Sequence, residues 1–249
     1  MQAKIVSERK HYSLIELSSV DSTNNYAANV LSDGSVADFT VILAHNQTAG
    51  RGQRGSVWQT APNKNLTASV IVTAIHLPAS QHFLLNMAVS LSVHKLLRHV
   101  IKKDIFVKWP NDIWVEDSKI AGLLIENTIH GNTINESIIG LGLNLNQTDF
   151  PEGINATSLK QITGADFDVI EVLDLWIAIL KKQLQDFKAE PLKKEYLSYL
   201  KWLHIEQTYH YKNHELKATI MDVDASGRLV LVSVGGQRMV ADLKEIKHV

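Results

Sequence analysis

A loop rich in glycine and arginine follows a short β-branched run near the start of the chain. Its residues with clear chemical use are Gly50, Arg51, Gly52, Arg54 and Gly55. Glycines let a backbone bend tightly around a ligand, and guanidinium groups suit carboxylate and phosphate. The glycine spacing matches the dinucleotide-binding fingerprint, but that fingerprint requires a helix directly afterwards, and residues 56–65, SVWQTAPNKN, have no helical pattern. The loop is therefore predicted to bind an anion outside a Rossmann context; the alternative is a mobile basic surface loop.

A second polar segment, residues 108–126, combines the break Trp-Pro-Asn-Asp with a predicted hairpin. Pro110 cannot donate to a strand ladder, so the regular pattern stops there. Two β-rich runs then flank a polar turn, and Lys119 stands at the start of the second run. Beside Asn111 and Asp112, this lysine would neutralise an anion in a cleft. The alternative is a solvated strand end after a tight loop.

Together the two segments supply the cations Arg51, Arg54 and Lys119, but no nucleophile. This combination suits a reaction in which the substrate brings its own nucleophile. Adenylation of a carboxylic acid by ATP is one such reaction. It joins two anions, so catalysis is mostly positioning and electrostatic stabilisation.

The elements that must position these residues alternate between β-like and helical patterns. Strands are predicted at residues 12–17, 39–44, 66–73, 105–108, 113–115, 120–125 and 133–145. Helices are predicted at 21–31, 79–100, 169–187 and 190–200, and residues 147–166 read as a loop. From about residue 204, short strands alternate with turn residues and predict a small barrel-like appendage. The pattern indicates a mixed α/β domain followed by this appendage.

Polar residues also stand at the start of the first predicted helix. Asp21, Ser22 or Thr23 can cap its N-terminus, and Asn24 follows them. Capping alone would explain these side chains.

Glycines interrupt the strand predicted at 133–145. Gly140 and Gly142 indicate the close approach of a ligand or of another backbone, or else bulges. Asn144 and Asn146 share one side of this strand by its period of two.

Composition sets broad limits. The chain has 249 residues, 45% hydrophobic and 20% charged, which is ordinary for one large domain with or without a small appendage. A net charge of -1 gives no general reason to expect nucleic acid or an acidic membrane surface. The absence of cysteine excludes thiolate nucleophiles and Cys-based zinc sites, and the 11 histidines form no metal-binding motif. No apolar run suits a membrane span or a signal core, so a cytoplasmic location is expected.

Several ordered motifs then resemble those of biotin–protein ligases. They are Asp21-Ser-Thr-Asn24, Gln47-Thr-Ala-Gly-Arg-Gly-Gln-Arg-Gly55, Trp58, Lys108-Trp-Pro-Asn-Asp112, Lys119-Ile-Ala-Gly-Leu-Leu-Ile-Glu126 and Gly140-Leu-Gly-Leu-Asn144. They cover roughly residues 15–150. The resemblance implies a catalytic domain at 1–203, with a mixed sheet flanked by helices as in class II aminoacyl-tRNA synthetases. It also implies a small SH3-like β-barrel at 204–249.

The resemblance implies that biotin and Mg-ATP form biotinyl-5'-AMP and pyrophosphate, and that a lysine of a biotin carboxyl carrier protein then takes the biotinyl group. The implied biotin-binding residues are Ser22, Thr23, Asn24, Gln47, Gly50, Arg51, Trp58, Lys119 and Gly122. The implied ATP-binding residues are Arg51, Arg54, Trp58, Asn111, Lys119 and Asn144. The implied catalytic residues are Lys119, Arg51, Arg54 and Asp112. Lys119 would bridge the biotin carboxylate and the phosphate, Asp112 would orient or deprotonate the acceptor lysine, and no dedicated metal site is implied.

Two departures from the family pattern bear on these expectations. Gln53 stands where many relatives carry a basic residue, so retention of the adenylate would depend more on Arg51 and Arg54. Asp21 already belongs to the first motif, which leaves no room for the winged helix of the relatives that are repressors. A monofunctional enzyme without DNA binding is therefore expected, and a homodimer formed by sheet extension is possible for this family. The alternatives are a lipoate or octanoate ligase, whose glycine loop is patterned differently, and a non-catalytic biotin-binding sensor.

Overall fold

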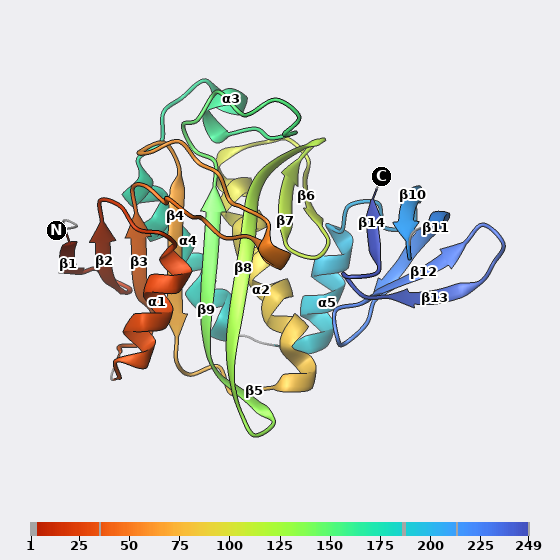
Figure 1. Ribbon diagram of the computed structural model, residues 1–249, viewed down its shortest axis with the longest axis horizontal. Helices are drawn as coiled ribbons and strands as arrows, with labels where there is room; N and C mark the ends of the chain where they lie inside the picture. Colours follow the sequence, from red (N-terminus) through yellow and green to blue (C-terminus); the bar gives the residue numbers. More distant parts are fainter. Residues whose placement is uncertain (1–3, 35, 186–187, 213, 249) are drawn as a thin grey trace.

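A computed structural model describes residues 4–34, 36–185, 188–212 and 214–248, and in them one large mixed sheet dominates the fold (Figure 1). Its strands are β1 (Lys4–Glu8), β2 (Ser13–Leu17), β3 (Thr40–Ala44), β4 (Leu66–Val72), β5 (Leu77–Pro78), β6 (Ile105–Lys108), β7 (Asp112–Val115), β8 (Ser118–His130) and β9 (Thr133–Leu143). Their order is β1-β2-β3-β4-β9-β8-β7-β6, with β5 beside β9. Only β2 and β3 pair in parallel within this sheet as described; the other pairs are antiparallel.

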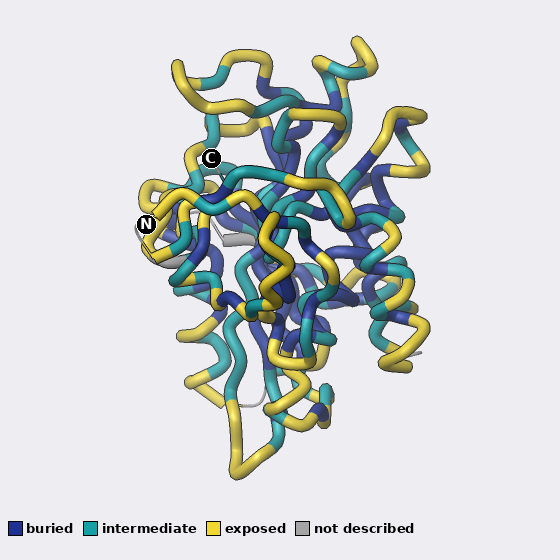
Figure 2. The backbone as a smooth tube through the Cα atoms, turned by 90° about the vertical axis from the view of Figure 1, so that its right-hand side faces the viewer, coloured by how far each residue is buried: buried dark blue, intermediate teal, exposed yellow. Residues whose placement is uncertain are grey.

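Helices cover one face of the sheet. They are α2 (His82–Val100), which follows the short 3-10 helix η2 (Ala79–Gln81), α4 (Val169–Gln185) and α5 (Ala189–Ser198). Strand alternation explains the packing, because successive side chains point to opposite faces. Leu66, Ala68 and Val70 of β4 join the core with Leu173 and Ile177 of α4, and all five are at most 1% exposed. In Figure 2 the buried, dark blue segments gather in the middle of the molecule, and exposed, yellow segments lie at the loop ends.

The opposite face is only partly covered. Helix α1 (Thr23–Ser32) packs on it through Ala27, beside Ile71 and Ile138. Further along the same face the alternation presents small or polar residues, among them Ser69 of β4 and Gly140 of β9, which are ladder partners. This face therefore keeps room for a ligand.

A second, smaller antiparallel sheet follows α5. Its strands are β10 (Glu206–Tyr211), β11 (His214–Val223), β12 (Leu229–Ser233), β13 (Arg238–Ala241) and β14 (Ile246–His248), in the order β13-β12-β11-β10-β14. It docks on the first sheet through the turn before β12: Trp109 Nε1 donates to the Gly227 carbonyl at 2.8 Å. The mixed α/β class and the small C-terminal β-unit are confirmed, while the boundary at residues 203 and 204 stays a prediction.

Other expectations need correction. The segment predicted as a loop at 147–166 contains the short helix α3 (Leu159–Thr163), and the strands β1 and β14 were not predicted. The hairpin strand β8 continues to His130, beyond the expected end at residue 125. Residues 186–187 of the predicted helix 169–187 lie outside the described residues. Among the described residues, none of the helices combines the length and the apolar character needed to span a membrane.

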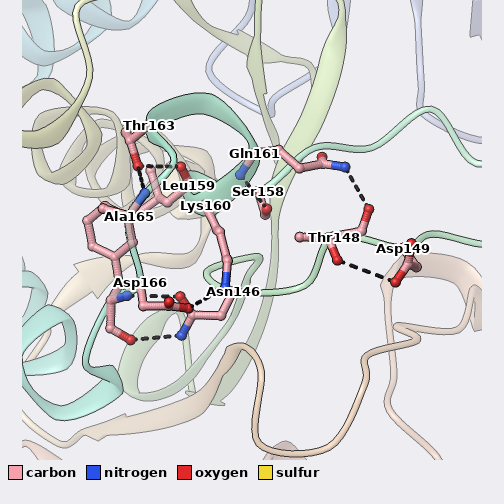
Figure 3. Close-up of polar contacts among 11 residues, drawn as sticks. Asn146, Thr148, Asp149, Ser158, Leu159, Lys160, Gln161, Thr163, Ala165 and Asp166 are labelled. Atoms are coloured by element: carbon pink, nitrogen blue, oxygen red, sulfur yellow. Dashed lines mark hydrogen bonds and ion pairs between the residues drawn. The ribbon is translucent and has the colours of Figure 1, made fainter.

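Hydrogen bonds hold the segment around α3 in place (Figure 3). The Asn146 side chain exchanges two hydrogen bonds with the Phe167 backbone, at 2.8 and 2.9 Å. Gln161 Nε2 donates to the Thr148 carbonyl at 2.7 Å, and Ser158 caps α3 by accepting from the Gln161 amide at 3.2 Å. Ser158 thus caps the N-terminus of α3, and the other polar side chains tie the flanking segments together.

Candidate active site

A pocket of about 430 Å³ opens on the uncovered face of the large sheet. It lies over β8 and β9, between α1, the glycine-rich loop and the segment before β7. Its lining includes the predicted residues Ser22, Thr23, Asn24, Gln47, Arg51, Trp58, Asn111, Asp112, Lys119 and Gly122. The sequence-based prediction thus brought together segments far apart in the chain.

Two of the predicted residues, Gly50 and Asn144, are not in that lining. The Gly50 carbonyl accepts from the Trp58 amide at 2.9 Å, and a Cβ on Gly50 would overlap the Trp58 carbonyl, so Gly50 shapes the loop. The Arg54 side chain lies outside the described residues. Asn144 is buried, and its Nδ2 donates to the Thr157 carbonyl at 3.0 Å. Their roles in ligand binding stay predictions.

A buried polar network forms one end of the pocket. Gln47 Oε1 accepts from the Thr23 amide at 2.8 Å. Ser69 Oγ lies 2.7 Å from Thr23 Oγ1 and 2.6 Å from Asn24 Oδ1. Because Asn24 Oδ1 can only accept, the single Ser69 proton goes to Asn24, and Thr23 donates to Ser69. Gln47 Nε2 remains as a donor and Thr23 Oγ1 as an acceptor, a pair that matches a cyclic urea or amide.

Ser22 lies at the N-cap position of α1 but does not act as a cap through its side chain. Its backbone is extended, and its hydroxyl makes no capping hydrogen bond. The side chain is 2% exposed and lines the pocket. Capping chemistry therefore does not explain this hydroxyl, which supports a role in ligand binding.

Two glycines make the pocket floor flat. A Cβ on Gly142 would overlap the Trp58 indole, and a Cβ on Gly122 would lie 3.3 Å from both Lys119 and Trp58. A Cβ on Gly140 would overlap the Asn24 amide. The close approach expected at Gly142 is thus made by the Trp58 side chain, and the one at Gly140 by the Asn24 side chain and the Leu124 carbonyl.

A lysine–aspartate pair lies at the middle of the pocket. Lys119 Nζ is 2.6 Å from Asp112 Oδ1 and 5.6 Å from the centroid of the Trp58 ring. The pair is possible because β7 and β8 are antiparallel neighbours, which brings Asp112 opposite Gly122 and Lys119 opposite Trp114. An anion bound beside Lys119 would compete with Asp112, and a released Asp112 carboxylate could accept a proton.

Arg51 reaches the pocket from the glycine-rich loop and is fixed by two oxygen acceptors. It donates to Asn25 Oδ1 and to Glu126 Oε1, each at 2.5 Å. Glu126 Oε2 also accepts from Asn24 Nδ2 at 2.7 Å, so one carboxylate joins the loop to the polar network. A hydrogen bond from Asn25, assisted by the charge of Arg51, lowers the pKa of Asp21.

Sequence reasoning missed Ser69 and Glu126. Ser69 stands inside an apolar run and becomes visible only through the register of β4 with β9. Glu126 closes one of the quoted motifs, and its position after the apolar run was the available signal.

Fold and site together define an α/β protein whose mixed sheet carries a pocket for a small molecule with an anionic end, joined to a small C-terminal β-unit. The model of the biotin/lipoate A/B protein ligase family matches residues 16–144, more than half of the 249 residues, and the chain belongs to this family.

Individual relatives agree with that assignment. The biotin protein ligase of Aquifex aeolicus, solved in complex with biotin and ATP, is 27% identical with a TM-score of 0.75, over 94% of this chain and 97% of that chain. The biotin–[acetyl-CoA-carboxylase] ligase of Mycobacterium tuberculosis is 27% identical over 94% of this chain and 89% of that protein. The bifunctional ligase/repressor BirA of Bacillus spizizenii is 26% identical over 89% of this chain and 70% of that protein.

Proposed function

We propose that this protein is a biotin–protein ligase, which activates biotin with ATP as biotinyl-5'-AMP and transfers the biotinyl group to a lysine of a biotin carboxyl carrier protein. The observation that carries the proposal is the single pocket that joins a urea-matching polar end to the Lys119–Asp112 pair and Arg51. The names of the relatives support biotin as the acid.

The activation step follows from these positions. The donor of Gln47 and the acceptor of Thr23 would hold the ureido ring, and the glycine floor would take the acyl chain beside Trp58. The carboxylate would then lie beside Lys119, where it attacks the α-phosphorus of ATP; the bond from that phosphorus to the α,β-bridging oxygen breaks, and pyrophosphate leaves with the electron pair. The ammonium of Lys119 and the guanidinium of Arg51 offset the negative charge that the two reactants bring together.

The transfer step needs an acceptor lysine in its neutral form. When the bound anion draws Lys119 away from Asp112, the Asp112 carboxylate is free to accept a proton from the incoming ammonium group. The acceptor nitrogen forms a bond to the acyl carbon, and AMP leaves. This role for Asp112 belongs to the proposal.

Magnesium would arrive with ATP as part of the substrate. In the described residues, no group of three or more His, Asp or Glu side chains could hold a metal ion. Magnesium commonly keeps several waters and is bound through phosphates with one or two carboxylates, so this lining fits an ion carried by the triphosphate. A cytoplasmic location and a homodimer are further parts of the proposal that need separate tests.

The test is acid-dependent exchange of pyrophosphate into ATP. The purified protein should catalyse exchange with biotin and not with lipoate or octanoate. Exchange with lipoate or octanoate alone would favour the other branch of the family, and biotin binding without any exchange would identify a sensor. Transfer is checked by labelling of a purified carrier domain and its loss when the acceptor lysine is replaced.

Substitution of Lys119 tests the central residue. Lys119→Ala should abolish exchange while biotin still binds, because the polar end of the pocket is unchanged. Exchange at the wild-type rate in this variant would refute the role of Lys119. Calorimetric binding of biotin controls for the integrity of the pocket.

A further inference from the structure

A carboxylate that the proposed function does not use binds the Arg51 side chain of the glycine-rich loop. Arg51 Nη2 donates to Glu126 Oε1 at 2.5 Å, in a pair whose side chains are 42% and 37% exposed. Arg51 lines the pocket that holds the Lys119–Asp112 pair, whereas Glu126 lies outside that lining. Both residues line a neighbouring recess of about 480 Å³, so Arg51 stands at the boundary between the two cavities.

The Glu126 carboxylate is held in position from α1. Its Oε2 accepts from Asn24 Nδ2 at 2.7 Å. Asn24 is 3% exposed, and its Oδ1 accepts from Ser69 Oγ at 2.6 Å, so the direction of this amide is fixed. The other oxygen of Glu126 is therefore presented to the loop by a carboxylate that cannot turn without breaking its hydrogen bond to Asn24.

A second acceptor for the same guanidinium is also oriented in advance. Asn25 Oδ1 accepts from Arg51 Nη1 at 2.5 Å, and Asn25 Nδ2 donates to Asp21 Oδ2 at 2.6 Å. Because an ionised carboxylate can only accept, Asp21 fixes the Asn25 amide with its oxygen towards Arg51. Two oriented oxygens, one of them charged, thus form a guanidinium site that the chain fills itself.

This guanidinium site lies away from the place where an acid and ATP would react. Glu126 and Gly122 share one face of β8, because successive side chains alternate, and four residues of strand span about 13 Å. Gly122 lies opposite Asp112, and a Cβ on Gly122 would lie 3.3 Å from Lys119 Nζ. The charged pair therefore lies at the level of Gly122. To bind a phosphate there, Arg51 must leave Glu126.

The pair between Arg51 and Glu126 is weak enough to be exchanged. Both side chains are more than a third exposed, and water and salt screen ion pairs of this kind, so they contribute little net stability. A phosphate presents oxygens that a guanidinium binds in the same forked geometry as a carboxylate. Nucleotide binding would thus replace one anionic partner of Arg51 by another.

We propose that Glu126 is a positioning residue that holds Arg51 in the empty enzyme and competes with the phosphates of ATP for its guanidinium. This inference rests on the proposed activation of an acid by ATP. Glu126 then lowers the affinity for the nucleotide. Its hydrogen bond to Asn24 keeps the carboxylate in place to take Arg51 back when AMP leaves.

The experiment measures binding of α,β-methylene-ATP, from which pyrophosphate cannot leave, to the whole protein by calorimetry. Glu126→Gln removes the charge and leaves an oxygen for Asn24, and Glu126→Asp keeps the charge. Glu116→Gln is the matched control, because Glu116 pairs with Lys103 at 2.8 Å outside the pocket lining and gives the same change in net charge. Glu126→Gln is also made in an Arg51→Ala background, since a residue that acts through Arg51 loses its effect there.

Glu126→Gln should bind the analogue about two- to fivefold more tightly than the wild type, as expected for the loss of a competing exposed ion pair. Glu126→Asp should shift the Kd less, Glu116→Gln should match the wild type, and the Kd for biotin should stay unchanged. In the Arg51→Ala background, Glu126→Gln should have no effect. Weaker or unchanged binding of the analogue by Glu126→Gln would overturn the inference, as would the same tightening without Arg51. A merely structural role would weaken the binding of both ligands.

A second measurement needs no ligand. Trypsin cleaves after arginine, so the rate of cleavage after Arg51 in the empty protein reports how firmly the loop is held. Glu126→Gln should raise this rate and Glu116→Gln should not, and equal rates in both variants would overturn the inference. A wild-type protein that binds the analogue but shows no biotin-dependent exchange would contradict the proposed function and not the role of Glu126.

Discussion

Replacement of Ser69 by alanine tests whether its buried hydroxyl sets the proton order of the polar network, that is, which atoms donate and which accept. Ser69 is fully buried and joins Thr23 Oγ1 to Asn24 Oδ1. Without it, Asn24 Oδ1 loses its donor, and an orphaned buried acceptor costs about 1–3 kcal/mol of stability. Since Gln47 Oε1, 3.1 Å away, already accepts from the Thr23 amide at 2.8 Å, the Thr23 hydroxyl would then point into the pocket.

That rotation changes what the pocket offers to a ligand. In the wild type, Thr23 Oγ1 is free to accept because its proton is held by Ser69. In the variant, a free proton on Thr23 would oppose the N–H of a ureido ring. The loss of one neutral hydrogen bond, about 1 kcal/mol, should raise the Kd for biotin about fivefold. Isothermal titration calorimetry measures this change, and urea unfolding measures the stability of each variant.

Ser92→Ala provides the matched control. Ser92 is also fully buried and makes two hydrogen bonds, one to the Val89 carbonyl and one from Trp176 Nε1, within the helical layer away from the pocket. It should lose a similar amount of stability without any change in biotin affinity. If Ser69→Ala lowers stability as Ser92→Ala does but leaves the Kd for biotin unchanged, the proposed proton order is wrong.

Two further predictions concern stability. Gly227→Ala should lower the free energy of unfolding by about 1–3 kcal/mol, because the φ of Gly227 is +81° and a Cβ there would overlap the Phe83 ring. Gly236→Ala is the control, since Gly236 has the same φ of +81° and no atom within 4 Å of its Cβ position, and it should lose less stability in urea titrations. Equal losses in the two variants would refute the packing argument. Burial, then the charge of Arg98, lowers the pKa of His94 from 6.5 to about 4. Between pH 6.5 and 4 the His94 imidazole therefore binds a proton in the unfolded chain but not in the folded protein. The contribution of His94 to the free energy of unfolding should be fully present above pH 6.5 and should fall by at most about 3 kcal/mol as the pH drops towards 4. His94→Gln should remove this slope, and an unchanged slope would contradict the assignment.

The types of the charged residues were enough to select three side chains that lie together around one pocket. Arg51, Lys119 and Asp112 each stood at a break in a regular pattern, where a side chain has no packing role to explain it. Their meeting in one pocket was predicted from the order of the motifs and not from any single spacing. Charged residues at breaks in the regular pattern can therefore be predicted from the sequence as candidates for a site.

Residues whose neighbours depend on the register of two strands could not be predicted from the sequence in the same way. Ser69 lies between apolar neighbours in β4, and every residue of that strand is buried. The polarity of β4 therefore does not alternate in a way that shows to which side of the sheet Ser69 points. Its partner Gly140 is known only once β4 and β9 are aligned. The same holds for Glu126, whose two hydrogen bonds reach α1 and the glycine-rich loop.

Ladder partners on β9, β8 and β7, namely Gly142, Gly122 and Asp112, form one row along the pocket floor. Gly142 and Gly122 contribute no side chains to this row, and Asp112 on the next strand does. The pocket floor is therefore uncharged at the two glycines and becomes charged towards the C-terminal sheet. The last strand of that sheet adds Lys247 to the pocket lining. A substrate that is apolar in its middle and increasingly anionic towards one end matches this gradient, and an acyl chain that ends in a phosphoanhydride has that distribution of charge.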